Sequence, residues 1–457
     1  MRNTNIALAL IAAAVLAACG GNGSTGGEQS LKNKFSAQVS FGDSLSDVGT
    51  YKVGTVANLG GGKFGINGDL TATNSALTGK NWTELLATQL GLPAPCAAVT
   101  GLDGVAAQGF AVPVVAHANC FGYAEGGSRI TNPVGIGNKL TGSPLGALTI
   151  PVATQIQNHL NVSGGKFSGT ELVLVMAGAN DVFVQLGGLK AAATAAGTTA
   201  GNATFGSTLV GLLAAGAPNP QGAAAAIGLA MQTELANPAH TDTTVVGAAV
   251  TAAVMQGNTA AGNVAVYGPM VSQAQSAGAT AGAKAGNDYF AAHGPDLVVA
   301  MTTAAAELNA LVRTKIIGNG ANFVVVNNLP DIGTTPLGRT FDAGTLGLVN
   351  AMVKAFNDTL SSGLGAEAKV ALVDAFAASH DQATNPAPYG LTNVTTPACD
   401  LLPAKNPLGN SLGCTGANLI AGDVSHYAFA DDVHPTPFVQ LLLARYVSKY
   451  MVQKGWI

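Results

Sequence analysis

The chain has 457 residues, a length that allows up to about three domains at roughly 150 residues each. Hydrophobic residues make up 48% and charged residues only 10%, which excludes a disordered chain, because disorder needs low hydrophobicity and high charge. The formal charge of −4 comes without a basic tract, so we expect no nucleic-acid partner. These numbers describe a large, apolar and weakly charged globular protein.

The N-terminal residues have the pattern of a removable export signal. Residues 6–15 are almost entirely Ala, Leu, Ile and Val, a run too short for the about 20 residues that span a bilayer. Leu-Ala-Ala then precedes Cys19, which resembles a bacterial lipoprotein signal, where cleavage leaves a lipid-modified cysteine. We therefore expect a signal peptide over residues 1–18 and a flexible, Gly-rich tether over residues 19–34.

The residue after Cys19 bears on where the protein is sent. This residue is Gly20 and not Asp, and in that respect the chain resembles lipoproteins that are sent on to the outer membrane. The resemblance implies an exported protein, held by lipid on the outer membrane of a Gram-negative bacterium. A simple secretory signal, with a periplasmic or secreted product, is the alternative.

The four remaining cysteines predict two disulfide bonds. An even number in an exported chain favours pairing, and four cysteines allow three connectivities. They are Cys96, Cys120, Cys399 and Cys414. Pairing of nearest neighbours would close short local loops, and an oxidising compartment makes four reduced thiols the weaker alternative.

Four short, continuously apolar runs predict β-strands that are buried on both faces. They cover residues 35–41, 172–177, 323–326 and 370–373. Helical patterns lie between them; one is expected to begin at Pro295 and end at Gly318, and the last begins at about Pro437. This alternation predicts an α/β fold, a doubly wound three-layer α/β/α sandwich with a parallel central sheet.

From about residue 187 to 294 the chain is rich in Ala, Gly and Thr and very poor in charge. No fixed repeat emerges, and we expect several weak helices inserted between two core strands. Two roles are open for this insertion. Long insertions on α/β cores often form a cap over the site, and the alternative is a packed helical subdomain without catalytic duty.

A serine follows the first predicted strand, in the sequence Phe-Gly-Asp-Ser-Leu-Ser-Asp of residues 41–47. At a strand-to-helix turn, backbone N–H groups converge and favour a developing negative charge, so Ser44 is a candidate nucleophile. The pattern differs from the Gly-x-Ser-x-Gly elbow of α/β-hydrolases, because Ser46 takes the second Gly position. A simple helix N-cap is the alternative role of Ser44.

A candidate base lies near the other end of the chain, just before the last predicted helix. A catalytic His needs a partner on its second ring nitrogen, and Asp431, three residues before His434, can supply one. Metal binding is the weaker alternative, because no second His stands nearby at ligand spacing. We expect neither a metal nor an organic cofactor.

These residues resemble the SGNH, or GDSL, hydrolases of lipase and esterase type, through four blocks in the family's order. The first block matches Gly-Asp-Ser-Leu at residues 42–45, which makes Ser44 the nucleophile and its own N–H an oxyanion donor. The second block resembles Tyr-Ala-Glu-Gly-Gly at residues 123–127. It implies an oxyanion donor at Gly127, with Gly126 as the alternative, although the family's usual Asn is Gly122 here.

The other two blocks complete the implied site. The third, Gly-x-Asn-Asp at residues 178–181, implies that the side-chain amide of Asn180 faces the oxyanion. The fourth implies His434 as the base and Asp431 as the residue that orients it, with Asp432 as a bystander. Further similarity to the bacterial secreted and lipoprotein branch extends the resemblance over most of the chain, and we assign residues 35–457 to one hydrolase domain.

The resemblance implies a flavodoxin-like fold and a serine hydrolase that cleaves carboxylic esters of acyl lipids or related compounds, phospholipids among them. The alternative is a catalytically silent surface lipoprotein that binds glycan or lipid on a decayed hydrolase scaffold. The remaining histidines have no comparable setting, and we expect them on the surface or in loops. They are His117, His159, His240, His293, His380 and His426.

Overall fold

The computed structural model describes residues 32–68 and 78–457, so the predicted signal peptide, Cys19 and most of the predicted tether lie outside the described residues. The chain is mixed α/β, and its larger sheet has four parallel strands in the order β1-β4-β5-β6. They are β1 (Gln38–Gly42), β4 (Leu172–Met176), β5 (Phe323–Asn327) and β6 (Val370–Val373). Each apolar run that predicted a strand therefore forms one, and the strands are parallel as expected.

The described residues form the following α-helices, several of which connect the strands or cover them. They are α2 (Gly54–Asn58), α3 (Trp82–Gln89), α4 (Val152–Val162), α5 (Ala179–Ala214), α6 (Pro220–Leu235), α7 (Asp242–Met255), α8 (Val264–Leu311), α9 (Ala343–Leu364), α10 (Ala375–Thr384) and α11 (Pro437–Gln453). The last helix begins at Pro437 as predicted, with Thr436 as its N-cap. Within the described residues, no helix is both long enough and apolar enough to cross a membrane.

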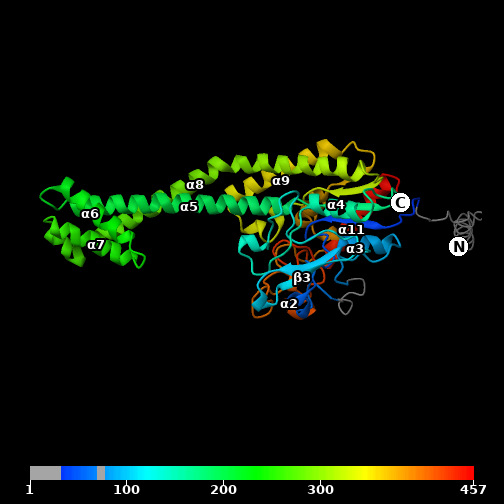
Figure 1. Cartoon of the computed structure of the whole chain (residues 1–457), viewed down its shortest axis with the longest axis horizontal. Coiled ribbons are helices and arrows are strands. Elements are labelled where there is room, and N and C mark those ends of the chain that lie inside the picture. The colour runs from blue at the N-terminus through cyan, green and yellow to red at the C-terminus, as the bar shows by residue number, and fades with distance from the viewer. Residues whose placement is uncertain (1–31, 69–77) are drawn as a thin grey trace, which may run out of the picture.

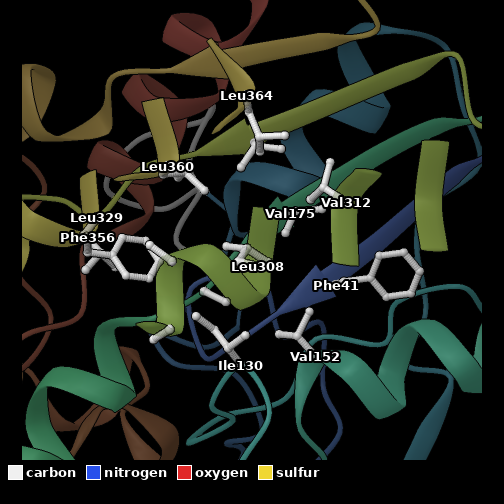
Figure 2. Close-up of a cluster of buried hydrophobic side chains, with 14 of the residues drawn as sticks. Phe41, Ile130, Val152, Val175, Leu308, Val312, Leu329, Phe356, Leu360 and Leu364 are labelled. Atoms are coloured by element: carbon white, nitrogen blue, oxygen red, sulfur yellow. The ribbon is translucent and has the colours of Figure 1, made fainter. Parts of the chain in front are cut away.

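The parallel strands pack into two separate hydrophobic clusters, because successive side chains of a strand point to opposite faces. Val173 and Val175 of β4 belong to the cluster that contains buried residues of α4, α8 and α9. Figure 2 shows this cluster, in which Phe356 of α9 lies beside Leu329. Leu172 and Leu174 belong instead to the cluster formed with α3 and α11. Both faces of the sheet are therefore buried.

A second sheet was not predicted from the sequence. It pairs β2 (Val99–Asp103) antiparallel with β3 (Ala111–Ala116). The Cys96–Cys120 disulfide closes the segment that contains it, and a second disulfide joins Cys399 to Cys414. The prediction of two disulfides is confirmed, and the pairing is that of nearest neighbours.

Two long helices form an arm that extends away from the sheets (Figure 1). α5 leaves the end of β4 and runs for 36 residues, and α8 returns over 48 residues toward β5. At 1.5 Å per residue, α5 alone is about 54 Å long. Neighbouring parallel strands need a crossover connection, and the arm is a greatly lengthened crossover between β4 and β5.

Glycines let the two helices of the arm approach backbone to backbone. A Cβ built on Gly197 would lie 2.8 Å from the carbonyl oxygen of Gly282, and one on Gly282 would lie 2.9 Å from that of Gly197. Gly201 and Gly278 oppose each other in the same way. Because tertiary packing supplies most helical stability in proteins, this close contact supports long helices in a sequence of modest helix propensity.

The structure bears on three expectations for this region. Four helices, α5 to α8, lie between β4 and β5, so the expected insertion of several helices is present, but α5 and α8 are long and continuous and extend beyond residues 187–294 at the two ends. Pro295 lies inside α8 instead of opening a helix; packing of α8 against α5 and α9 outweighs the hydrogen bond that proline cannot donate. Of the two roles left open, the arrangement agrees with the packed helical subdomain, because α6 and α7 lie at the end of the arm remote from the sheets and share a hydrophobic cluster there with parts of α5 and α8 (Figure 1).

His159 is a further correction, because this histidine of α4 is buried with only 1% of its surface exposed. Its ring lies among the rings of Phe41, Phe121, Tyr123 and Phe167. Neither ring nitrogen has a hydrogen-bond partner among the described residues. Burial lowers the pKa of His159 to about 4, since the charged form cannot be solvated there.

We expect His159 to make the folded state sensitive to acid. Its pKa is about 4 in the folded chain and about 6.5 in the unfolded chain, so the unfolded state binds more protons between these values. As pH falls from about 6.5 toward 4, the wild type should lose up to about 1.4 kcal/mol per pH unit relative to His159→Leu. Urea unfolding of both proteins at pH 7.5 and pH 5 measures this difference. An unchanged difference at the two pH values would contradict it, and His240→Leu, at an exposed histidine, is the control.

Candidate active site

The predicted nucleophile, base and orienting carboxylate form one hydrogen-bonded row. Nε2 of His434 lies 2.9 Å from Oγ of Ser44. Nδ1 of His434 lies 2.9 and 2.8 Å from the two carboxylate oxygens of Asp431. Ser44 follows the carboxyl end of β1, and the other two residues lie in the turn before α11. The row can activate a hydroxyl group for nucleophilic attack.

Asp431 is buried and accepts hydrogen bonds from several backbone groups. Its oxygens lie 2.8 Å from the N–H nitrogen of Ser411, 2.9 Å from that of Val433 and 2.7 Å from that of His434. Burial raises the pKa of this carboxyl group, but the His434 imidazole and the hydrogen bonds outweigh burial and hold it below its ordinary value. The carboxylate is therefore ionised at neutral pH and can stabilise an imidazolium.

Asp432 has a different setting from its neighbour. Its side chain is exposed, and its carboxylate has no hydrogen-bond partner among the described residues. Its backbone carbonyl accepts a hydrogen bond from the N–H of Leu337. The partial burial of its carboxyl group and the adjacent Asp431 both raise the pKa of Asp432. The structure thus pairs His434 with Asp431 and leaves Asp432 aside.

Hydrogen bonding distinguishes the two glycines of the second block. The N–H of Gly126 donates to Oδ2 of Asp47 at 2.9 Å. No described residue accepts a hydrogen bond from the N–H of Gly127 or of Ser44. Gly127 has a φ of 82°, and a Cβ there would lie 2.0 Å from the carbonyl oxygen of Ile136, so only glycine fits. The donors without partners are therefore Ser44 and Gly127, not Gly126.

The third predicted donor lies in the first turn of α5. Nδ2 of Asn180 donates one hydrogen bond to the carbonyl of Ser128 at 2.9 Å, which fixes the amide and leaves its second N–H. The next residue, Asp181, accepts from Nε of Arg129 at 2.8 Å and from the N–H of Ile130. This largely buried ion pair ties the base of the arm to the segment that follows Gly127.

Asp47 joins the turn that follows Ser44 to the segment that contains Gly126, a role that the sequence did not suggest. Its Oδ1 accepts from the N–H groups of Gly49 and Thr50, both at 2.8 Å, and its Oδ2 from that of Gly126. Burial raises its pKa to about 6, although these hydrogen bonds lower it. An Asp side chain that accepts a hydrogen bond from the backbone N–H two residues later is a recognisable turn pattern. The hydrogen bond with Gly126, which is distant in sequence, has no such local pattern.

Gln155 of α4 holds the turn in front of Ser44. Its side-chain amide exchanges two 2.8 Å hydrogen bonds with the backbone N–H and carbonyl of Gly42. Asp43 follows, and burial raises its pKa to about 7, while a hydrogen bond from Leu45 and the nearby His434 lower it. The sequence suggested no role for either side chain. His426, close in sequence to the fourth block, packs against Phe438 instead of joining the site.

The candidate nucleophile, base and hydrogen-bond donors border one cleft of about 500 Å³. Ser44, Gly127, Asn180 and His434 line it, and much of the remaining wall is apolar. That part includes Phe64, Phe183, Leu186, Ile332, Leu337 and Phe341. A substrate in the cleft would therefore meet the nucleophile, the donors and a hydrophobic surface together.

In the part of the chain that the structure describes, no three His, Cys, Asp or Glu side chains are grouped so that they could hold a metal ion. Comparison of the chain with models of known protein families and with curated proteins found no match in either case. The geometry of the site therefore indicates what chemistry it can perform.

Proposed function

We propose that this protein is a serine hydrolase that cleaves carboxylic ester bonds of acyl lipids or related esters, phospholipids among them. The observation that carries the proposal is the row from Ser44 through His434 to Asp431, with distances of 2.9 and 2.8 Å. Three hydrogen-bond donors lie in the same cleft as this row. A silent binding protein would have no need of such an arrangement, which counts against the alternative.

The geometry supports an acyl-transfer mechanism. Oγ of Ser44 attacks the ester carbonyl carbon while Nε2 of His434 accepts its proton, and Asp431 stabilises the imidazolium. The N–H groups of Ser44 and Gly127 and the amide of Asn180 stabilise the oxyanion of the tetrahedral intermediate. Collapse releases the alcohol, which takes the proton from His434. Water, activated by the same histidine, then hydrolyses the acyl-enzyme.

The fold assignment belongs to the same proposal. We assign the chain a three-layer α/β/α sandwich of the SGNH hydrolase type. The two hydrophobic clusters on opposite faces of the parallel sheet support this assignment. Ser44 and Asn180 follow the carboxyl ends of β1 and β4, where ligands bind in open α/β sheets.

Replacement of the nucleophile tests the proposed function directly. Ser44→Ala should abolish hydrolysis of a chromogenic short-chain ester, because among the described residues no other hydroxyl is hydrogen-bonded to His434 Nε2. It should also abolish labelling by an active-site-directed phosphonate. Thermal unfolding should stay nearly unchanged, since Ser44 lines a cleft rather than the core. Full activity or labelling in this variant would refute the assignment.

Two further substitutions separate the oxyanion donors from the base. Asn180→Ala removes one donor and should lower kcat by about 10²–10³-fold with little change in KM. Asp431→Asn should lower kcat by up to about 10⁴-fold. It should also move the acid limb of the pH–rate profile to lower pH, because a neutral amide no longer stabilises the imidazolium. In Asn180→Ala that limb should stay in place.

Asp432→Asn is the matched control for Asp431→Asn. The two carboxylates are adjacent, but only Asp431 is bonded to His434. pH–rate profiles of the three variants and the wild type make the comparison. A large loss of kcat in Asp432→Asn, with Asp431→Asn nearly normal, would show that the site was assigned to the wrong carboxylate.

The proposed location is a membrane surface reached through lipid on Cys19. Two disulfides are consistent with an exported chain, because such bonds persist in oxidising compartments. Cys19→Ser should release the protein from membranes, since that thiol is the expected attachment point of the lipid. Fractionation after a high-salt wash measures this. Retention of the variant in the membrane fraction would point to another anchor.

A further inference from the structure

A small apolar chamber lies next to the active-site cleft. It encloses about 100 Å³, and most of its wall is hydrophobic. Ala378 of α10 and Val439 and Leu443 of α11 contribute to this wall, together with Met176 at the end of β4. A single water-sized group needs only about 10–15 Å³, so the chamber has room for several carbon atoms.

The chamber and the cleft share part of their walls. Leu45, Pro330, Thr335 and Val433 line both spaces. Leu45 directly follows Ser44, and Val433 directly precedes His434. Both side chains are half-buried and lie at the boundary of the two spaces. The chamber is therefore adjacent to the bond that the proposed reaction breaks.

Three of the four polar side chains in the wall are already hydrogen-bonded within the protein, which favours an apolar occupant; Gln382 is the fourth. Oδ2 of Asp331 lies 2.7 Å from Nδ1 of His380. Oγ of Ser379 accepts a hydrogen bond from the N–H of Asp331 at 2.8 Å. The hydroxyl of Thr335 donates to the carbonyl of Ile332. These groups have little to offer a polar ligand, which would lose its hydration on entry.

We propose that this chamber binds the acyl chain of the substrate, which enters past Leu45 and Val433 while the larger cleft holds the alcohol part. The proposal rests on the proposed ester hydrolase function and names the part of the site that selects chain length. Its physical basis is hydrophobic burial. Each methylene group moved from water into the chamber should raise kcat/KM about fourfold until the space is filled.

A matched pair of substitutions on α10 tests the chamber. Ala378 is buried and lines it, whereas Ala377 is exposed and does not. We expect Ala378→Leu to lower the ratio of kcat/KM for p-nitrophenyl octanoate to that for p-nitrophenyl acetate at least tenfold. Ala377→Leu should leave this ratio at the wild-type value. An equal ratio in the two variants would overturn the proposal.

Binding without turnover keeps this test separate from the proposed function. In the Ser44→Ala background, isothermal titration with sodium octanoate should show at least tenfold weaker binding for Ala378→Leu than for Ala377→Leu. Equal affinities, or no binding to Ser44→Ala itself, would overturn the chamber assignment. If octanoate binding depends on Ala378 but the wild type hydrolyses no ester, the chamber stands and the hydrolase function fails. Should Ala378→Leu not fold, Val439→Phe fills the same space from α11.

Discussion

The parallel pairing of β1 with β4 is the constraint on which the site depends. Gly42 is in register with Met176, and a Cβ on Gly42 would lie 2.0 Å from the carbonyl oxygen of Met176. The chain can therefore turn at this point only with glycine, and Gln155 holds the turn from the other side. As a result, Ser44 and Asn180 leave the same sheet edge from neighbouring strands, although they are far apart in sequence.

Buried carboxylates then connect the turns that surround this edge. Asp47 joins the serine turn to Gly126, and Asp181 joins the start of α5 to Arg129. Each carboxylate is costly to bury alone, and the hydrogen bonds it accepts offset that cost. These bonds hold both sides of the segment that contains Gly127, whose N–H no described residue accepts. Preorganised donors of this kind are the ones that stabilise a developing oxyanion.

The arm begins inside the site, because Asn180 lies in the first turn of a helix that continues for 36 residues. Only the base of this helix borders the cleft, through residues such as Phe183 and Leu186. The remaining length depends on contact with α8, where opposed glycines allow the backbones to touch. The arm is therefore structurally continuous with the sheet edge that carries the proposed site, while its far end has a separate small core.

The sequence by itself determined the four parallel strands, the two disulfides and the residues that meet around Ser44, because each has a local signal: a short apolar run, an even cysteine count, or a polar motif after a strand. It did not determine the long arm, the burial of His159 or the role of Asp47. Those depend on contacts between residues distant in sequence, such as Gly197 with Gly282 and Asp47 with Gly126. Propensity and spacing describe only neighbours along the chain, whereas packing decides which helices persist and which polar groups are buried. The difference between Gly126 and Gly127 is also visible only in the folded chain, where the N–H of Gly126 donates to Asp47 and no described residue accepts that of Gly127.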